Sequence, residues 1–141
     1  MPSEPTPDAV RLRVAAPEDI VEARQVGRAL AARAGCPSID LTVVATAISE
    51  IARNIVTYAG RGEIDIRIER GGGRRSLLVV ARDEGPGIAD VDRAQEDGFT
   101  TGRGLGLGLP GARRLMDEFE IESREGEGTV VTMRKWCGLD G

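Results

Sequence analysis

The stretch Asp83-Glu84-Gly85-Pro86-Gly87 decides the fold, because it places a carboxylate and two glycines directly after an apolar run, residues 76–82. That run reads SLLVVAR and is typical of a buried strand. Glycine allows positive φ and a close approach of the backbone to a ligand. A carboxylate at the end of a strand can accept a hydrogen bond from an exocyclic amine such as that of adenine. Taken alone, Asp83 also suits the start of a tight turn.

A second glycine motif, Gly102-Arg103-Gly104-Leu105-Gly106-Leu107-Gly108, leads directly into a helix that we expect over about residues 106–118. Unpaired N–H groups at a helix N-terminus bind anions, so phosphate is the natural ligand of this motif. It lacks the Gly-Lys-Ser/Thr of a Walker A sequence and does not directly follow a strand, as a Rossmann fingerprint does. Residues 83–104 read as a long loop with a short helical piece near 90–97, and long loops are usually functional or disordered. A flexible loop with turn glycines is the alternative for either motif alone.

The third signal lies on a helix expected over about residues 39–59, where Glu50 and Asn54 are four residues apart and share one face. This face lies beside the apolar stripe of the helix, so both side chains could reach a cleft over a sheet. Asn54 offers a neutral oxygen suited to Mg²⁺, and Glu50 suits a general base toward a hydroxyl or water. The alternative is a solvated helix face with a polar pair.

The rest of the chain predicts an α/β protein, a two-layer sandwich with a mixed β-sheet and helices on one face. Ser38 is expected to cap the second helix, and the glycines at 71–73 to turn a hairpin. The expected helices cover 17–34, 39–59 and 106–118, and the expected strands cover 10–15, 63–69, 76–82, 119–124 and 128–136.

Length and composition exclude several classes of function. The 141 residues suit one domain, which we place at 10–137 after a Pro-rich, disordered tail at 1–9. A net charge of −4 argues against nucleic acid as a partner, and the apolar runs are too short to span a membrane. No histidine is present, which excludes a phosphohistidine intermediate and argues against a zinc enzyme. The two cysteines are interpreted as reduced thiols of a cytoplasmic protein.

Together the motifs make the chain similar to the GHKL ATPases, a resemblance that covers residues 10–136. Glu50-x-x-x-Asn54 matches the N box of that family, and residues 83–87 match its adenine-binding G1 box. Residues 102–109 match the G2 box, and Glu127-Gly128-Thr129 is similar to the final Gly-Thr turn. The resemblance implies the Bergerat ATP-binding fold, with ATP and Mg²⁺ as ligands.

Within that family the chain resembles the RsbT-like switch kinases and the anti-sigma-factor kinases. The resemblance rests on residues 51–55 with 58–60, 97–101, 108–111 and 114–119. It implies a serine/threonine protein kinase that transfers the γ-phosphate of ATP. The implied substrate is a STAS-domain antagonist or scaffold protein in bacterial stress-response partner switching. A PP2C-type phosphatase or a sigma factor is implied as a further partner.

The resemblance also implies a role for each matching residue. Asp83 binds the adenine amine with help from Thr129, Asn54 coordinates Mg²⁺, and Glu50 orients or deprotonates the attacking hydroxyl. Arg103 is the candidate for offsetting charge on the γ-phosphate, or is simply solvated. Residues 88–103 form a lid over the nucleotide. The further nucleotide-binding positions are Gly85, Gly87, Thr100, Thr101, Gly102, Gly104, Leu105, Gly106 and Gly108.

Competing functions remain at this point. A histidine-kinase catalytic domain would be attached to a histidine-bearing helix, and a gyrase- or MutL-type ATPase needs a second domain. The alternative from another class is a nucleotide-binding module that sequesters a sigma factor or activates a phosphatase without essential kinase activity. Glu50 favours catalysis, because affinity for ATP alone does not require a base there. Residues 17–34 and the first strand stay open as a homodimer face or a partner face.

Overall fold

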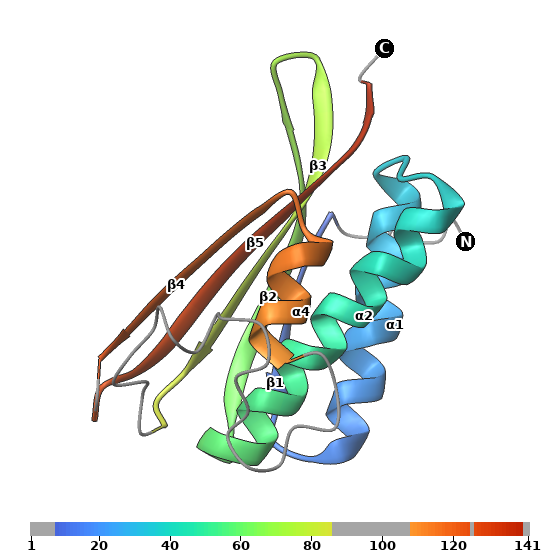
Figure 1. Ribbon diagram of the computed structural model, residues 1–141. Coiled ribbons are helices and arrows are strands. Elements are labelled where there is room, and N and C mark those ends of the chain that lie inside the picture. Colours follow the sequence, from blue (N-terminus) through green and yellow to red (C-terminus); the bar gives the residue numbers. More distant parts are fainter. Residues whose placement is uncertain (1–7, 86–107, 125, 140–141) are drawn as a thin grey trace.

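The computed structural model describes residues 8–85, 108–124 and 126–139. One sheet is covered on one face by helices (Figure 1), which confirms the two-layer α/β class. The elements in chain order are β1 (Ala9–Val14), α1 (Pro17–Arg33), α2 (Ser38–Asn54), the π-helix η1 (Ile55–Ala59), β2 (Gly62–Gly71), β3 (Arg74–Asp83), α4 (Gly108–Leu115), β4 (Glu118–Arg124) and β5 (Gly128–Leu139).

The strand order is β1-β2-β3-β5-β4, and every pair of described neighbours is antiparallel. The mixed sheet expected from the sequence was therefore wrong in this detail. β3 and β4 precede and follow α4 in the sequence and run in the same direction, as the two strands of a crossover unit do. They are not neighbours, because β4 lies at the sheet edge and β5 turns back between them (Figure 1).

The core lies between the inner face of the sheet and helices α1 and α2. Alternate residues of β2 and β3 point into it, and the large side chains among them are almost fully buried. Gly27 lets α1 approach closely, because a Cβ there would overlap the side chain of Ile48 on α2. The large, fully buried side chains of this layer include Leu30, Ile48, Ile51, Ile64, Ile66, Leu77 and Val79.

Two helix boundaries differ from the expected ones. Ser38 is the first residue of α2 and Pro37 takes the N-cap position, so the expected serine cap was wrong. The α-helix changes to the π-helix η1 at Ile55, and the helical segment ends at Gly60, where φ is +84°. α4 ends at Leu115, three residues before the expected end, because Asp117 already hydrogen-bonds with Arg134 and Trp136 of β5.

The outer face of the sheet carries charged side chains, and one of these is buried. Asp65 on β2 accepts hydrogen bonds from Arg11 at 2.8 Å and from Arg82 at 2.9 Å, and its side chain is 10% exposed. The hydrogen bond from Arg11 is the main reason that the pKa of Asp65 lies below its ordinary value, although burial opposes this shift. Three strands are thus joined on this face, since Arg11 lies on β1 and Arg82 on β3.

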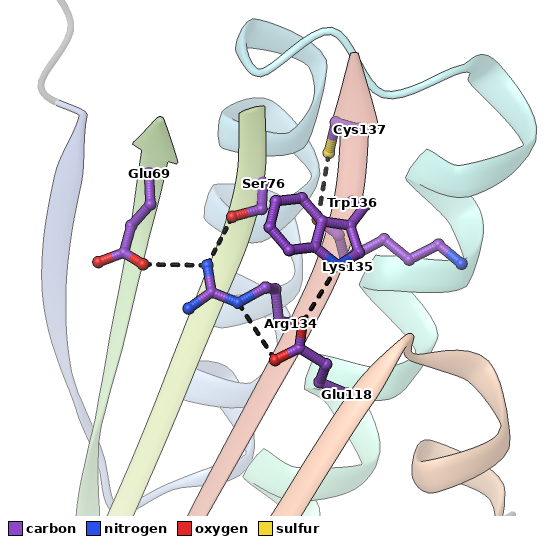
Figure 2. A network of polar contacts seen from close by, with 7 residues as sticks. All are labelled: Glu69, Ser76, Glu118, Arg134, Lys135, Trp136 and Cys137. Carbon is purple, nitrogen blue, oxygen red and sulfur yellow. Dashed lines mark hydrogen bonds and ion pairs between the residues drawn. The ribbon is translucent and has the colours of Figure 1, made fainter. Parts of the chain in front are cut away.

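A second polar network lies farther along the outer face and centres on Arg134 of β5 (Figure 2). Its guanidinium donates to Ser76 at 2.6 Å and to Glu69 at 3.0 Å, and its Nε lies 3.5 Å from Glu118. The indole Nε1 of Trp136 donates to Glu118 at 3.1 Å. Four strands contribute to this network, so it fixes their positions relative to one another.

The two cysteines form a disulfide, so the expected pair of reduced thiols was wrong. Cys36 lies between α1 and α2 and Cys137 lies on β5, with 4.1 Å between their Cα atoms. A separation of 101 residues gives no sequence signal for this pairing. It depends on the fold, which brings the α1–α2 connection next to the last part of β5.

Candidate functional site

The site is built at the end of the sheet where β3 ends and β5 begins, which we call the site end (lower part of Figure 1). Asp83 is the last residue of β3 and is paired with Gly62 of β2 on one side and with Thr129 of β5 on the other. Strand register therefore places Asp83 beside Thr129, the two residues expected to hold adenine.

Glycines on both neighbouring strands surround the backbone of Asp83. A Cβ at Gly62 would overlap the carbonyl oxygen of Arg82 and lie 3.1 Å from the Cβ of Asp83. Gly128 has φ of +95°, and a Cβ there would overlap the carbonyl oxygen of Asp83 itself. The close approach of three strands at this point fixes the direction in which the Asp83 side chain leaves the sheet.

One oxygen of the Asp83 carboxylate is hydrogen-bonded to the backbone. The N–H of Gly85 donates to its Oδ1 at 2.9 Å, and among the described residues Oδ2 has no hydrogen-bond partner. Gly85 packs against η1, because a Cβ at Gly85 would lie 2.6 Å from the Cβ of Ala59. A half-buried carboxylate oriented in this way fits an exocyclic amine, which has the protons that Oδ2 can accept.

Thr129 is held by a hydroxyl chain from β4. Its Oγ1 lies 2.8 Å from the Oγ of Ser123, and that Oγ also reaches the carbonyl oxygen of Gly128 at 2.9 Å. A serine hydroxyl has one proton. If Ser123 gives it to Gly128, Thr129 donates to Ser123 and keeps its lone pairs as an acceptor. This arrangement fits the same amine that Asp83 would bind.

Glu50 and Asn54 lie one helical turn apart at the end of α2, as the sequence predicts. Glu50 is only 8% exposed, and Asn54 is the last residue of the α-helix and half-buried. The Nη1 of Arg53 donates to the Oε1 of Glu50 at 2.9 Å. The site therefore contains a buried carboxylate with a cation attached to one of its oxygens.

Helix α4 brings its N-terminus to the same end of the molecule. It packs against α2 and begins at Gly108, near the place where α2 ends (Figure 1). N–H groups at the start of a helix have no intrahelical acceptor and attract anions. The described start of α4 is thus placed to contribute to a phosphate site.

The other expected nucleotide-binding positions, the lid at 88–103 and the helical piece near 90–97 lie outside the described residues. Their roles stay predictions. These positions are Gly87, Thr100, Thr101, Gly102, Arg103, Gly104, Leu105 and Gly106.

Three residues of the site were missed from the sequence. Arg53 could have been found, because it follows Glu50 by three positions and that spacing brings side chains together on a helix. Gly62 and Ser123 could not, because their roles depend on which residues of neighbouring strands are paired.

The described ranges contain no cluster of three or more histidine, cysteine or acidic side chains that could hold a metal ion. Mg²⁺ needs no such cluster where one side-chain oxygen, water and phosphate oxygens suffice, so Asn54 still fits it. No helix in these ranges has the length and apolar character needed to cross a bilayer.

A family model and curated relatives assign the chain to the same family. The family described as "Histidine kinase-like ATPase domain" matches residues 14–135. The serine/threonine-protein kinase RsbT of Bacillus subtilis is 49% identical over 125 residues, which cover 89% of this chain and 94% of that protein. The anti-sigma F factor of Thermoanaerobacter sp. strain X514 is 34% identical over 124 residues, covering 84% and 85%.

Solved structures share the fold at low sequence identity. The RsbU and RsbW domains of Rv1364c from Mycobacterium tuberculosis match with a TM-score of 0.62 and 21% identity. This match covers 96% of the present chain and 34% of that one. The mycobacterial sensor histidine kinase MprB matches with a TM-score of 0.56 and 15% identity, over 95% and 99% of the two chains.

Proposed function

This chain belongs to the family of histidine kinase-like ATPase domains, and we propose that it is a serine/threonine protein kinase acting on a STAS-domain partner. The observation that carries the proposal is the pairing of two features at one end of the molecule. An adenine-type acceptor pair, Asp83 and Thr129, lies at the strand ends, and a buried carboxylate, Glu50, lies at the end of α2. The 49% identical relative named as a serine/threonine kinase supports the same reaction.

Asp83 and Thr129 bind the adenine of ATP in this proposal. The exocyclic amine donates to Oδ2 of Asp83 while Gly85 keeps Oδ1 in place. Thr129 accepts the remaining amine proton, directly or through water. Replacing Asp83 by asparagine puts N–H groups where acceptors are needed, so nucleotide affinity should fall.

The phosphates lie toward the start of α4 and the end of α2. Asn54 offers the amide oxygen that would hold Mg²⁺, and the bound ion would neutralise charge on the triphosphate. The N–H groups at the start of α4 would bind phosphate oxygens. Gly102, Gly104 and Gly106 lie outside the described residues, and the sequence motif predicts that they bind phosphate as well.

Glu50 acts on the acceptor hydroxyl. The serine or threonine oxygen of the partner attacks the γ-phosphorus, and a new O–P bond forms. The bond between the γ-phosphorus and the bridging oxygen breaks, and ADP leaves with that electron pair. The proton of the attacking hydroxyl passes to the Glu50 carboxylate. The rest of the acceleration comes from positioning and neutralised charge.

Labelled ATP, Mg²⁺ and a purified STAS-domain protein test the proposal. Wild-type protein should label the STAS protein on serine or threonine. Glu50→Ala should abolish the transfer while leaving ADP affinity within about twofold, because Glu50 acts in the chemical step. Glu120→Ala, an exposed change on β4, is the matched control and should label normally. A wild-type protein that binds ATP and labels no partner contradicts the kinase proposal.

A nucleotide-dependent interaction module is the second candidate, because several relatives near 34% identity are named anti-sigma F factors. In that function ATP or ADP sets the affinity for a sigma factor or a PP2C-type phosphatase, and transfer is secondary. Glu50→Ala separates the two functions, since it removes a required activity of a kinase and leaves a binding module intact. The pathway we infer is bacterial partner switching in a stress response, in the cytoplasm.

A further inference from the structure

We propose that Arg53 is a positioning residue for Glu50, holding its carboxylate in one orientation during phosphate transfer. The inference rests on the proposed function, because it assigns the partner of the base in that reaction. Arg53 touches neither substrate nor reacting atoms in this role and acts through Glu50 alone.

The geometry of the pair is direct. The Nη1 of Arg53 lies 2.9 Å from the Oε1 of Glu50, which is the distance of a charge-assisted hydrogen bond. The Glu50 side chain is 10% exposed and the Arg53 side chain is 51% exposed. The cation therefore reaches inward from solvent and covers one oxygen of a carboxylate that water hardly reaches.

A simple helix-stabilising pair explains this contact poorly. Pairs of opposite charge on an exposed helix face contribute little to stability, and that function does not require one partner to be buried. Burying a carboxylate is unfavourable unless a cation or hydrogen bonds compensate. The neighbouring positions of α2 are filled by small and aliphatic side chains, among them Ala47, Ile51 and Ala52. An acidic residue is nevertheless present among these apolar positions, and Arg53 forms an ion pair with it.

The arginine also meets a requirement of a general base. A base must be oriented toward the proton that it accepts, and the hydrogen bond from Arg53 to Oε1 limits rotation of the Glu50 carboxylate. The proton of the acceptor hydroxyl then passes to a carboxylate that is held in one orientation.

Arg53 is separate from the adenine-binding residues. Asp83, Gly85 and Thr129 lie at the strand ends, and Arg53 lies on α2 with its side chain directed to Glu50. Loss of Arg53 should therefore lower the rate of transfer and leave nucleotide binding unchanged.

The test uses the full chain with Mg²⁺, labelled ATP and a purified STAS-domain protein as acceptor. Arg53→Met keeps an unbranched, flexible side chain, although a shorter one, and removes the charge, and Arg53→Lys keeps a cation. We expect Arg53→Met to lower kcat by roughly tenfold to a hundredfold, with the KM for ATP and the Kd for ADP within about twofold of wild type. Arg53→Lys should recover part of the lost rate. Arg67→Gln on the exposed outer face of β2 is the matched control.

The outcomes separate this inference from the function on which it rests. A wild-type protein that labels no acceptor contradicts the kinase function itself. An active wild type with an equally active Arg53→Met variant overturns the inference alone, as does a loss of ADP affinity in proportion to the loss of rate. The thermal midpoint of each variant is measured beside its rate. A slow Arg53→Met variant that melts like wild type and is partly rescued by lysine supports the inference.

Discussion

The two ends of the sheet are built in opposite ways. At the site end, Gly62 and Gly128 pack closely against the backbone around Asp83, and side-chain acceptors there are available to a ligand. At the other end, which we call the tethered end, the Cys36–Cys137 disulfide and the network around Arg134 join the elements to one another. The polar side chains around Arg134 at the tethered end are hydrogen-bonded within the protein, whereas Oδ2 of Asp83 has no partner among the described residues.

The comparison indicates that the tethered end stabilises the fold and that the site end binds the ligand. Cross-links at the tethered end add stability without occupying any group that the reaction needs. The site end contains glycines and a half-satisfied carboxylate, which are unfavourable for stability and suited to binding. Changes at the two ends should therefore separate into effects on unfolding and effects on nucleotide binding.

The disulfide gives the largest expected effect and acts at the tethered end only. Reduction with dithiothreitol, or the change Cys36→Ser, should lower the free energy of unfolding by about 4 to 5 kcal/mol, because the loop that it closes spans 101 residues. Thermal melting with and without reductant measures this loss. ADP affinity below the melting temperature should not change. A melting temperature of the wild type that does not respond to reductant would contradict the prediction, and the Cys36→Ser variant is the unresponsive control.

Gly128→Ala should affect both stability and binding, which makes it the sharpest test of the site end. A Cβ there would overlap the Asp83 carbonyl oxygen, and φ is +95°. We expect a loss of roughly 3 kcal/mol in stability and weaker ADP binding measured by calorimetry. Gly126→Ala is the matched control, since its φ is +81° and no atom lies near its added Cβ. Equal effects of the two substitutions on ADP binding would show that crowding of Asp83 is unimportant.

Arg134→Met should lower stability by a smaller amount, about 1 to 3 kcal/mol, because it leaves Glu69 and Ser76 without their donor. Urea denaturation measures this loss. Phosphate transfer at a temperature where the variant is folded should match the wild type. A loss of transfer in a fully folded Arg134→Met variant would break the proposed separation of the two ends.

Asp65 gives the smallest effect, and it depends on pH. Its pKa is lowered in the folded protein, so its contribution to stability is fully present above the unfolded pKa near 4. That contribution is lost as the pH falls through the folded pKa. The difference in urea midpoint between wild type and Asp65→Asn should be largest at neutral pH and shrink toward pH 3. A difference that grows on acidification would contradict this assignment.

Local patterns predicted most of the architecture. The alternation of 63–69 and the apolar run of 76–82 gave strands that the structure extends at both ends. The hairpin glycines were confirmed, since Gly72 and Gly73 have positive φ. The antiparallel character of the whole sheet was missed, because the insertion of β5 between β3 and β4 is a property of the chain path and has no local signal.

The candidate site divides in the same way. Glu50, Asn54 and Asp83 were identifiable because each lies in a short motif with a fixed spacing. The disulfide partner of Cys36 and the hydrogen bond of Ser123 to Thr129 depend on contacts across the fold. Arg53 was within reach of the sequence, since helix geometry alone brings it to Glu50.

The π-helix η1 has a consequence for how this site can vary. A π-turn contains about one residue more than an α-turn, and it commonly marks a functional position in a helix. Here that additional residue sets the angle at which Ala59 meets Gly85, downstream of Glu50 and Asn54. A deletion of one residue within 55–59 would rewind the segment to an ordinary helix and turn Ala59 away, while the upstream pair kept its place. A change of length at this point would thus alter the contact between Ala59 and Gly85 near the adenine-binding residues, and would leave Glu50 and Asn54 in place.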